Sequence, residues 1–300
     1  MPESRFFSPP HPWRVTPAEA RSIQDGLAER VSCRGELSGI GTVAGMTVRY
    51  TNGGSITGAA VALFSLPGLT PLSAAVASGP TTLPCVPGLL SFREMPAALD
   101  ALNALGEAPD LLICSGQGYA HPSRSGLACH MGVITHLPTI GIARTLLSGK
   151  FNEVGNHIRD FSALKDGGET IGAALRTRPN VKPVFVSVGH GISPGSDIRC
   201  VLRCTTRFRM PAPLRQASHL ASNCPAACRR SRRAGFHGPA NRPRAPVAQS
   251  GRICSMYFGT SSISSLRTSA STTNGRSSPW KCSRQPARPR VSSGRGTMSR

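Results

Sequence analysis

Hydrophobic positions in the first 200 residues follow two periods, which predict helices and strands in a definite order. A capping signal at Thr16-Pro17-Ala18-Glu19 precedes apolar residues at helical spacing, from position 20 to position 31. Three apolar runs with strand character follow, at 43–50, 59–65 and 72–77. The first two flank the turn signal Asn52-Gly53-Gly54, so the pattern predicts an antiparallel meander after the first helix.

The pattern changes after this meander. Residues 80–87 contain three prolines, which predict a stiff, exposed loop, and residues 94–105 have helical spacing. Two short runs, 111–114 and 139–143, lack polar alternation, as parallel strands covered on both faces do. We also expect a loop-rich stretch at 150–168, strands at 170–176 and 184–188, and a helix at 193–204 capped by Ser193.

The order of these elements predicts the fold class. An antiparallel meander, a helix and then parallel strands between helices is the order of the ribonuclease H-like fold. We therefore expect an α/β protein with a mixed sheet flanked by helices. The run at 111–114 ends in the glycine turn Gly116-Gln117-Gly118, and α/β sheets place their sites at such carboxyl ends of strands.

Several motifs occur in order along residues 13–222 and resemble the endonuclease V family, nucleases that nick DNA near deaminated bases. They are HPWRVTPAEA at 11–20, TVAGMTVRY at 42–50, PCVPGLLSFRE at 84–94, CSGQGYAHPSRSGLACHMG at 114–132, LPTIGIARTLLSG at 137–149 and VKPVFVSVGHGIS at 181–193. The resemblance implies metal-dependent phosphodiester hydrolysis near hypoxanthine, with DNA as the substrate and RNA as an open alternative.

The resemblance also assigns roles to individual positions. The family has aspartates where this chain has Thr47 and Ser115, and these two carboxylates bind the catalytic Mg²⁺ together with the glutamate that corresponds to Glu94. His190 matches a family histidine expected near the metal. Without the resemblance, Glu94 reads as a helix-start carboxylate favoured by the helix dipole, and Thr47 and Ser115 are ordinary residues.

A second set of positions is expected to contact DNA. Cys85 replaces the aromatic residue of a family loop that wedges into DNA beside the damaged base, and Arg144 replaces a family lysine. His121 is either a turn residue or a site residue, and Arg124 and Arg144 either contact phosphate or are solvated. His130 and His136 are interpreted as ordinary helix and loop residues. The full set is Pro84, Cys85, Pro87, Gly88, Gly116, Gly118, His121, Arg124 and Arg144.

The two substitutions change the expected chemistry. Mg²⁺ requires hard oxygen ligands, usually including one or two carboxylates, whereas threonine and serine offer only neutral hydroxyls. We therefore expect weak metal binding and a chemical step reduced by at least ~10³-fold. Two other functions stay open: a nucleic-acid-binding protein without catalysis, and the non-functional product of a decaying gene.

Charge divides the chain into two unlike segments. Residues 1–197 contain 15 basic and 14 acidic residues, whereas residues 198–300 contain 20 basic residues and no acidic ones. From about position 222 the composition is too poor in large apolar residues to form a core. The sequence thus predicts an N-terminal extension at 1–12, a domain at 13–222 and a disordered basic tail at 223–300. The tail either adds non-specific phosphate binding or is an uninformative extension, such as a shifted reading frame.

The ten cysteines and the chain start bear on localisation and on metals. No secretory signal and no membrane-spanning run is visible, so we expect a cytoplasmic protein with reduced thiols. Cys200-x3-Cys204 and Cys224-x3-Cys228 fit the loose spacing of a structural zinc site, an interpretation we do not favour because the second pair falls in the tail. The resemblance implies a monomer.

Overall fold

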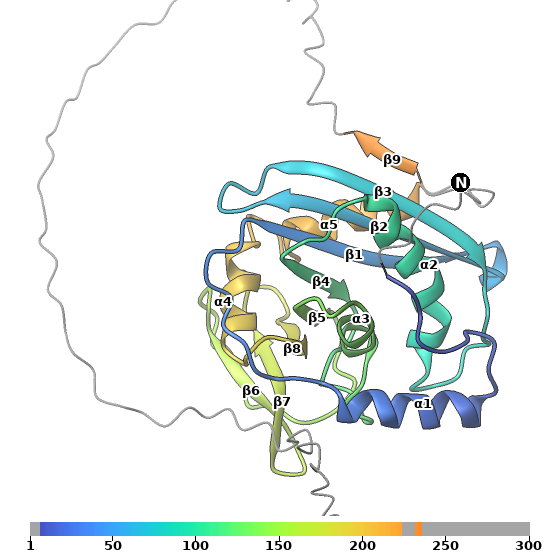
Figure 1. Cartoon of the computed structure of the whole chain (residues 1–300). Helices are drawn as coiled ribbons and strands as arrows, with labels where there is room; N and C mark the ends of the chain where they lie inside the picture. The colour runs from blue at the N-terminus through green and yellow to red at the C-terminus, as the bar shows by residue number, and fades with distance from the viewer. Residues whose placement is uncertain (1–6, 224–231, 236–300) are drawn as a thin grey trace, which may run out of the picture. The chain divides into compact units, whose positions relative to one another are not determined.

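The structure is a computed structural model that describes residues 7–223 and 232–235, and its core is a mixed sheet (Figure 1). The described strands follow the order β6-β7-β8-β5-β4-β1-β2-β3-β9 across the sheet. The strands are β1 (Thr42–Thr51), β2 (Ile56–Ser65), β3 (Pro71–Pro80), β4 (Leu111–Ser115), β5 (Thr139–Ala143), β6 (Phe161–Asp166), β7 (Glu169–Leu175), β8 (Val184–His190) and β9 (Arg232–Gly235). The helices are α1 (Pro17–Glu29), α2 (Leu90–Leu105), α3 (Leu127–Thr135), α4 (Ser196–Arg203) and α5 (Ala212–Ser222), with a 3₁₀ turn at Asn52–Gly54.

The pairing of the strands confirms the predicted fold class. β1, β2 and β3 form the antiparallel meander, and β4 and β5 extend the sheet parallel to β1. β8 then runs antiparallel to β5, followed by the antiparallel β7 and β6. The fold is thus of the α/β class, with a mixed sheet flanked by helices.

Three local expectations differ from the structure, and one helix is additional to them. Residues 161–166, expected in a loop-rich stretch, form β6, which pairs with β7 across the turn Gly167-Gly168. Helix α2 begins at Leu90, so Glu94 lies in its second turn instead of at its start. Helix α4 begins at Ser196, because the Ser193 hydroxyl bonds Glu36 and Ser196 and does not cap the helix. Helix α5 was not expected, although its buried Leu214, Ala217 and Ala221 have helical spacing.

Helices cover both faces of the meander. Met95, Leu99 and Leu102 of α2 pack with Met46 and other residues of β1–β3. Leu214 and Ala217 of α5 pack on the other face, and Figure 1 shows the two helices on opposite sides of β1 and β2. A Cβ at Gly45 would overlap the backbone of Pro213, so only glycine lets α5 approach β1 this closely. This contact brings α5 beside the segment of β1 that contains Thr47.

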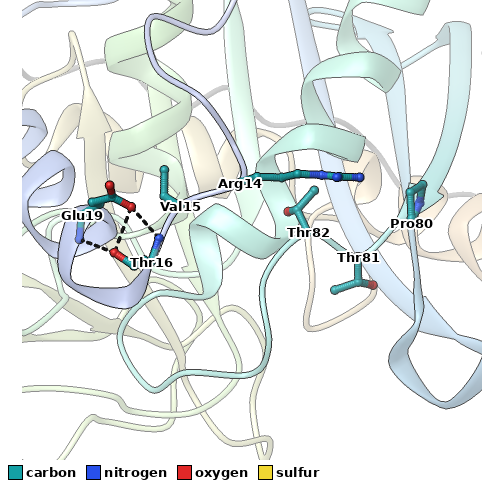
Figure 2. A pocket seen from close by; sticks show the side chains of 7 residues that line it. All are labelled: Arg14, Val15, Thr16, Glu19, Pro80, Thr81 and Thr82. Carbon is teal, nitrogen blue, oxygen red and sulfur yellow. Dashed lines mark hydrogen bonds between the residues drawn. The ribbon is translucent and has the colours of Figure 1, made fainter.

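Helix α1 begins as predicted and fixes two loops. Its capping box is complete: Thr16 N donates to Glu19 Oε2 at 2.7 Å, and Glu19 N donates to Thr16 Oγ1 at 3.3 Å (Figure 2). Buried Gln24 donates from Nε2 to the carbonyls of Gly88 and Ser125, both at 2.9 Å. One amide group therefore holds the proline-rich loop and the loop after the glycine turn together.

A pocket of about 480 Å³ lies between the start of α1 and the end of β3. Figure 2 shows the Arg14 side chain extending toward Thr82 and Pro80 along its wall. The hydroxyls here are already engaged: Thr81 donates to Gly54 O and Thr82 to Phe92 O. We interpret this pocket as a consequence of packing between the two elements.

Gly118 closes the glycine turn after β4. Its amide donates to Ser187 Oγ at 3.0 Å, and a Cβ at this position would overlap the carbonyl of Val188. The turn can therefore pack against β8 only with glycine at position 118.

Gly118→Ala is expected to lower the free energy of unfolding by about 1–3 kcal/mol, because the added methyl group overpacks this contact. Gly79→Ala is the matched control, since no atom lies within 4 Å of a Cβ there, and we expect a change under about 0.5 kcal/mol. Urea denaturation of both variants measures the difference. Equal effects would contradict the packing role of Gly118.

The predicted tail is described only in small part. Asn223 ends α5 as its cap residue, and strand β9 at Arg232–Gly235 pairs antiparallel with β3. The expected disorder otherwise concerns residues 224–231 and 236–300, which lie outside the described residues, as do residues 1–6 of the N-terminal extension. Within the part of the chain that the structure describes, none of the helices has the length and apolar character needed to cross a membrane.

Candidate functional site

The structure brings Thr47 and Ser115 together. Met46 pairs with Cys114 at the end of the parallel β1–β4 ladder, and Thr47 and Ser115 come directly after this pair. Met46 and Cys114 pack on the α2 side of the sheet, so pleat alternation directs Thr47 and Ser115 to the α5 side. The two hydroxyl side chains are therefore neighbours at the carboxyl end of β4.

Glu94 reaches this end of the sheet from α2. Its Oε1 accepts a hydrogen bond from the Tyr50 hydroxyl at 2.9 Å. Burial raises the pKa of the Cys114 thiol, and the charges of Cys129 and Glu94 raise it further, which places Glu94 close to the residue before Ser115. Burial also raises the pKa of Glu94 to about 7, against the opposing effects of the Tyr50 hydrogen bond and the Arg93 charge. Among positions 47, 94 and 115, only position 94 has a carboxylate, and its raised pKa makes it easily protonated.

The donor set does not fit the magnesium ion that the motif implies. Thr47 Oγ1 is buried and makes no hydrogen bond, and Ser115 offers one neutral hydroxyl. Across residues 7–223 and 232–235, no three His, Cys, Asp or Glu side chains gather closely enough to hold a metal ion together. Mg²⁺ needs anionic oxygen ligands to offset the cost of losing its water shell, and this arrangement offers one carboxylate.

His190 lies away from these residues, so the expectation that it sits beside the metal position is wrong. It pairs with Thr139 at the start of β5, whereas Ser115 pairs with Ile142, three residues further along the same strand. Three residues of a strand span roughly 10 Å. The His190 ring accepts a hydrogen bond from Ser32 N at 3.3 Å, and burial lowers its pKa. His190 lies at the end of β8, as the motif indicates. Because β8 runs antiparallel to β5, this end lies beside the start of β5, away from Ser115.

The proline-rich loop lies next to Glu94 and its partner Tyr50. Pro84, Cys85 and Pro87 are exposed, as expected for this loop. Burial raises the pKa of Tyr50, with contributions from the charges of Glu94 and Cys85, so the Cys85 thiol is close to the Tyr50–Glu94 pair. The loop is thus positioned beside the site, with a small thiol at the expected wedge position.

Gly88 and His121 meet where this loop approaches the segment after the glycine turn. Gly88 has a left-handed backbone, with φ of 82°, and a Cβ on it would contact the His121 ring. His121 is buried, accepts from Ser123 N at 3.2 Å, and has its pKa lowered to about 4 by burial and by Arg124. These contacts favour the turn role for His121 over a proton-transfer role.

Arg124 already has two acidic partners. Its Nε lies 2.8 Å from Glu169 Oε2 and its Nη1 3.0 Å from Asp166 Oδ2, and its side chain is 13% exposed. Arg124 therefore anchors the β6–β7 hairpin. The expected phosphate contact stays a prediction, and it would compete with these two ion pairs.

Arg144 lies on a pocket that sequence reasoning did not identify. The pocket encloses about 500 Å³ beside α5 and is lined by Phe64, Arg144, Ala212, Arg215, Gln216, Ser218, His219 and Ser222. Ser218 Oγ accepts a hydrogen bond from Arg49 Nη2 at 3.3 Å, and Arg49 follows Thr47 by two residues on the same face of β1. The unrecognised helical spacing of residues 214–221 was the signal that could have located α5, and with it this pocket.

The sequence model described as Endonuclease V matches residues 25–219, more than half of the chain. The chain belongs to the endonuclease V family. Among its relatives, endonuclease V of Azotobacter vinelandii is 46% identical over 222 residues, which cover 74% of this chain and 99% of the relative. Endonuclease V of Roseiflexus sp. is 47% identical over 212 residues, covering 71% of this chain and 95% of the relative.

Solved structures agree with this membership. Endonuclease V from Streptomyces avermitilis superposes with a TM-score of 0.68 at 39% identity, covering 70% of this chain and 93% of that one. Human endonuclease V superposes with a TM-score of 0.64 at 30% identity, covering 69% of this chain and 97% of that one. The matched region of this endonuclease V family member therefore spans nearly the whole length of these relatives.

The remaining histidines and cysteines lie in structural positions. His130 is buried in α3, where Ser91 and His11 bond its two ring nitrogens, and His136 ends that helix with φ of 58°. Cys200 and Cys204 are buried within and after α4. The second half of the disfavoured zinc interpretation, Cys224 and Cys228, lies outside the described residues.

Proposed function

We propose that this family member recognises DNA near deaminated bases and that its metal-dependent phosphodiester hydrolysis is strongly reduced. The observation that carries the proposal is the neighbouring placement of Thr47 and Ser115 at the end of the β1–β4 ladder. These are the two positions at which the family motif has metal-binding aspartates. Membership of the family supports the substrate class, and the hydroxyls support the loss of hydrolysis.

The substrate class also has support from a related complex. Endonuclease V of Ciona intestinalis, 23% identical with a TM-score of 0.60, was solved with a 23mer DNA containing an inosine followed by a ribo-adenosine. In this chain the glycine turn directly follows Ser115, and the proline-rich loop lies beside the Tyr50–Glu94 pair. Cys85 cannot stack on a base, so recognition of the damaged base is expected to lose about 1–3 kcal/mol of stacking free energy.

A second function, nucleic-acid binding without catalysis, is favoured by one specific observation. The pocket beside α5 is lined by two arginines together with polar and apolar residues, and none of its described lining residues is acidic. The preference for DNA over RNA and the monomeric state are proposed from the family resemblance. The role of the basic tail is proposed from its composition. A non-functional gene product is the remaining alternative.

Nicking and binding of inosine-containing duplexes test the proposal together. We expect nicking with Mg²⁺ or Mn²⁺ to be at least ~10³-fold slower than that of a relative with both aspartates. We also expect binding to an inosine duplex to exceed binding to the unmodified duplex. Nicking at the rate of the relative would contradict the impairment, and equal affinity for both duplexes would favour binding by charge alone.

A further inference from the structure

The outer edge of β3 is closed by a strand from the tail. β3 pairs with β2 from Pro71 to Pro80, so its other edge is available to a further strand. That strand is β9, which pairs antiparallel with residues 73–76 and lies beside β3 in Figure 1. β3 has ten residues and β9 has four, so the tail covers part of a much longer edge.

The β3 edge lacks the features that keep edge strands from pairing with other chains. Its sequence, PLSAAVASGP, contains no charged residue, and its two prolines stand at the ends. Edge strands of native proteins are instead short, charged or interrupted by proline, because a row of unpaired amides and carbonyls is a template for a further strand. β3 by itself is therefore an open site for strand addition.

The strand at the other end of the described sheet has such protection. β6 ends in Lys165-Asp166, and on its outer side Lys150 N donates to Lys165 O at 2.7 Å while Lys165 N donates to Lys150 O at 2.8 Å. β9 has comparable features, because it is short and two of its four residues are arginines. With β9 in place, both outer strands of the described sheet are therefore short and charged.

The tail is positioned to supply this strand to its own chain. Residues 224–231 join Asn223, the cap of α5, to Arg232, the first residue of β9, so the strand is tethered by a short linker. A short tether gives an effective concentration on the order of millimolar, which favours closure within the chain over pairing with a second copy. Residues 232–235 lie beyond 25–219, the region that matches the family model, so the closing strand comes from outside the matched domain.

We infer that the outer edge of β3 is a strand-addition site and that residues 232–235 occupy it within the same chain, where they prevent edge-to-edge association. The tail then has a role besides the two that its composition left open. The inference goes beyond the proposed function, because it does not depend on whether the chain binds or cuts DNA. A second copy, with β3 paired antiparallel to β3 about a two-fold axis, is the competing occupant.

Hydrogen exchange and sedimentation velocity on the full chain test this inference. Arg233→Pro combined with Ala234→Pro removes two adjacent amides, one of which faces β3 in an antiparallel pair. We expect alternate amides of residues 73–76 to exchange about 10- to 100-fold faster, as for the loss of a local closure. We also expect dimers to form as the protein concentration rises. Arg233→Ser combined with Ala234→Ser is the matched control, since it removes the same charge, keeps both amides and is expected to behave as the parent.

A charge on β3 itself tests where the copies meet. Leu72 of β3 is 46% exposed, and Leu72→Lys in the double-proline variant is expected to return the protein to monomer, because a lysine on an edge strand opposes pairing. Leu146→Lys is the control, because Leu146 is 42% exposed and lies outside β3, and it is expected to leave the dimers intact. Dimers that persist in both lysine variants would place the contact elsewhere and overturn the inference.

Three further results would overturn the inference. Circular dichroism melts report whether each variant folds, and Ala234→Pro alone carries the test if the double variant does not. Unchanged exchange in a folded proline variant would show that residues 232–235 do not occupy the edge. Monomers at every concentration would show that the edge needs no cover. A dimeric parent that the prolines convert to monomer would assign β9 to the edge of a second copy instead of its own.

Discussion

Thr47→Asp combined with Ser115→Asp is expected to increase Mg²⁺-dependent nicking of inosine DNA by at least ~10³-fold. The two side chains lie next to each other after the Met46–Cys114 pair, on the face that α5 covers. Aspartates there would provide two anionic oxygen donors at neighbouring strand ends, near Glu94. Bound Mg²⁺ would then orient water and offset charge that builds up on the phosphate.

Burial makes this double variant costly without metal. Thr47 is 6% exposed, and a carboxylate at that position loses hydration that only a cation can replace. We therefore expect the melting temperature of the double variant to be below that of the parent in EDTA and to rise on addition of Mg²⁺, whereas the parent changes little.

Two controls keep this prediction specific. Thr47→Asn combined with Ser115→Asn has nearly the same shape without charge, and it is expected to show neither nicking nor stabilisation by Mg²⁺. A truncation near position 222 removes any contribution of the tail. If the folded aspartate variant binds Mg²⁺ and still does not nick, the loss of two ligands does not explain the impairment.

The second large effect concerns acid stability. His130 is 1% exposed, with Nε2 2.9 Å from His11 Nε2 and Nδ1 3.1 Å from Ser91 Oγ. Burial, with a smaller effect from His11, lowers its pKa to about 3. The unfolded chain takes up this proton near pH 6.5, and the folded chain does so only near pH 3. The contribution to the free energy of unfolding is therefore present above pH 6.5 and lost as the pH falls toward 3, on the order of 5 kcal/mol in total.

Other buried groups titrate in the same range, so the prediction concerns a difference between variants. His121, whose pKa is lowered to about 4, acts in the same direction as His130. Burial raises the pKa of Asp197 to about 6 and of Glu94 to about 7, and these two groups act in the opposite direction. His130→Gln removes one titrating group, so its unfolding free energy is expected to fall less than that of the parent between pH 6.5 and 4.

Urea denaturation at several pH values measures this difference. His157→Gln is the control for removing a histidine at the surface, because the His157 side chain is 95% exposed, with Nδ1 3.5 Å from Asp160 Oδ2. Parallel pH profiles for His130→Gln and the parent would show that the folded state accommodates a protonated His130. Burial of His130 would then not limit acid stability.

Local sequence signals predicted the elements whose causes are local. The Thr16–Glu19 capping box, the Asn52-Gly53-Gly54 turn and the apolar strands β4 and β5 are as expected, because caps, turns and periods act within a few residues. Helix α5 was missed because its period is short and flanked by prolines and arginines. The start of α2 was misplaced because its N-cap residue, Leu89, has no side chain that can cap a helix.

Contacts between distant residues could not be predicted in this way. Glu94 lies beside Tyr50, and Arg124 pairs with Asp166 and Glu169, because of how the helix and hairpin pack on the sheet. The pocket beside α5 likewise depends on Phe64 of β2, Arg144 after β5 and residues of α5, which share no sequence motif.

The sequence by itself determined the family, the antiparallel meander followed by parallel strands, and the replacement of two carboxylates by Thr47 and Ser115, because each is written in short motifs and periods. Only the tertiary structure decided that Thr47 and Ser115 are neighbours, that His190 lies at the other end of the strands and that Arg144 and Arg215 line one pocket beside α5. Strand direction and register set those distances, and both depend on packing across the whole sheet.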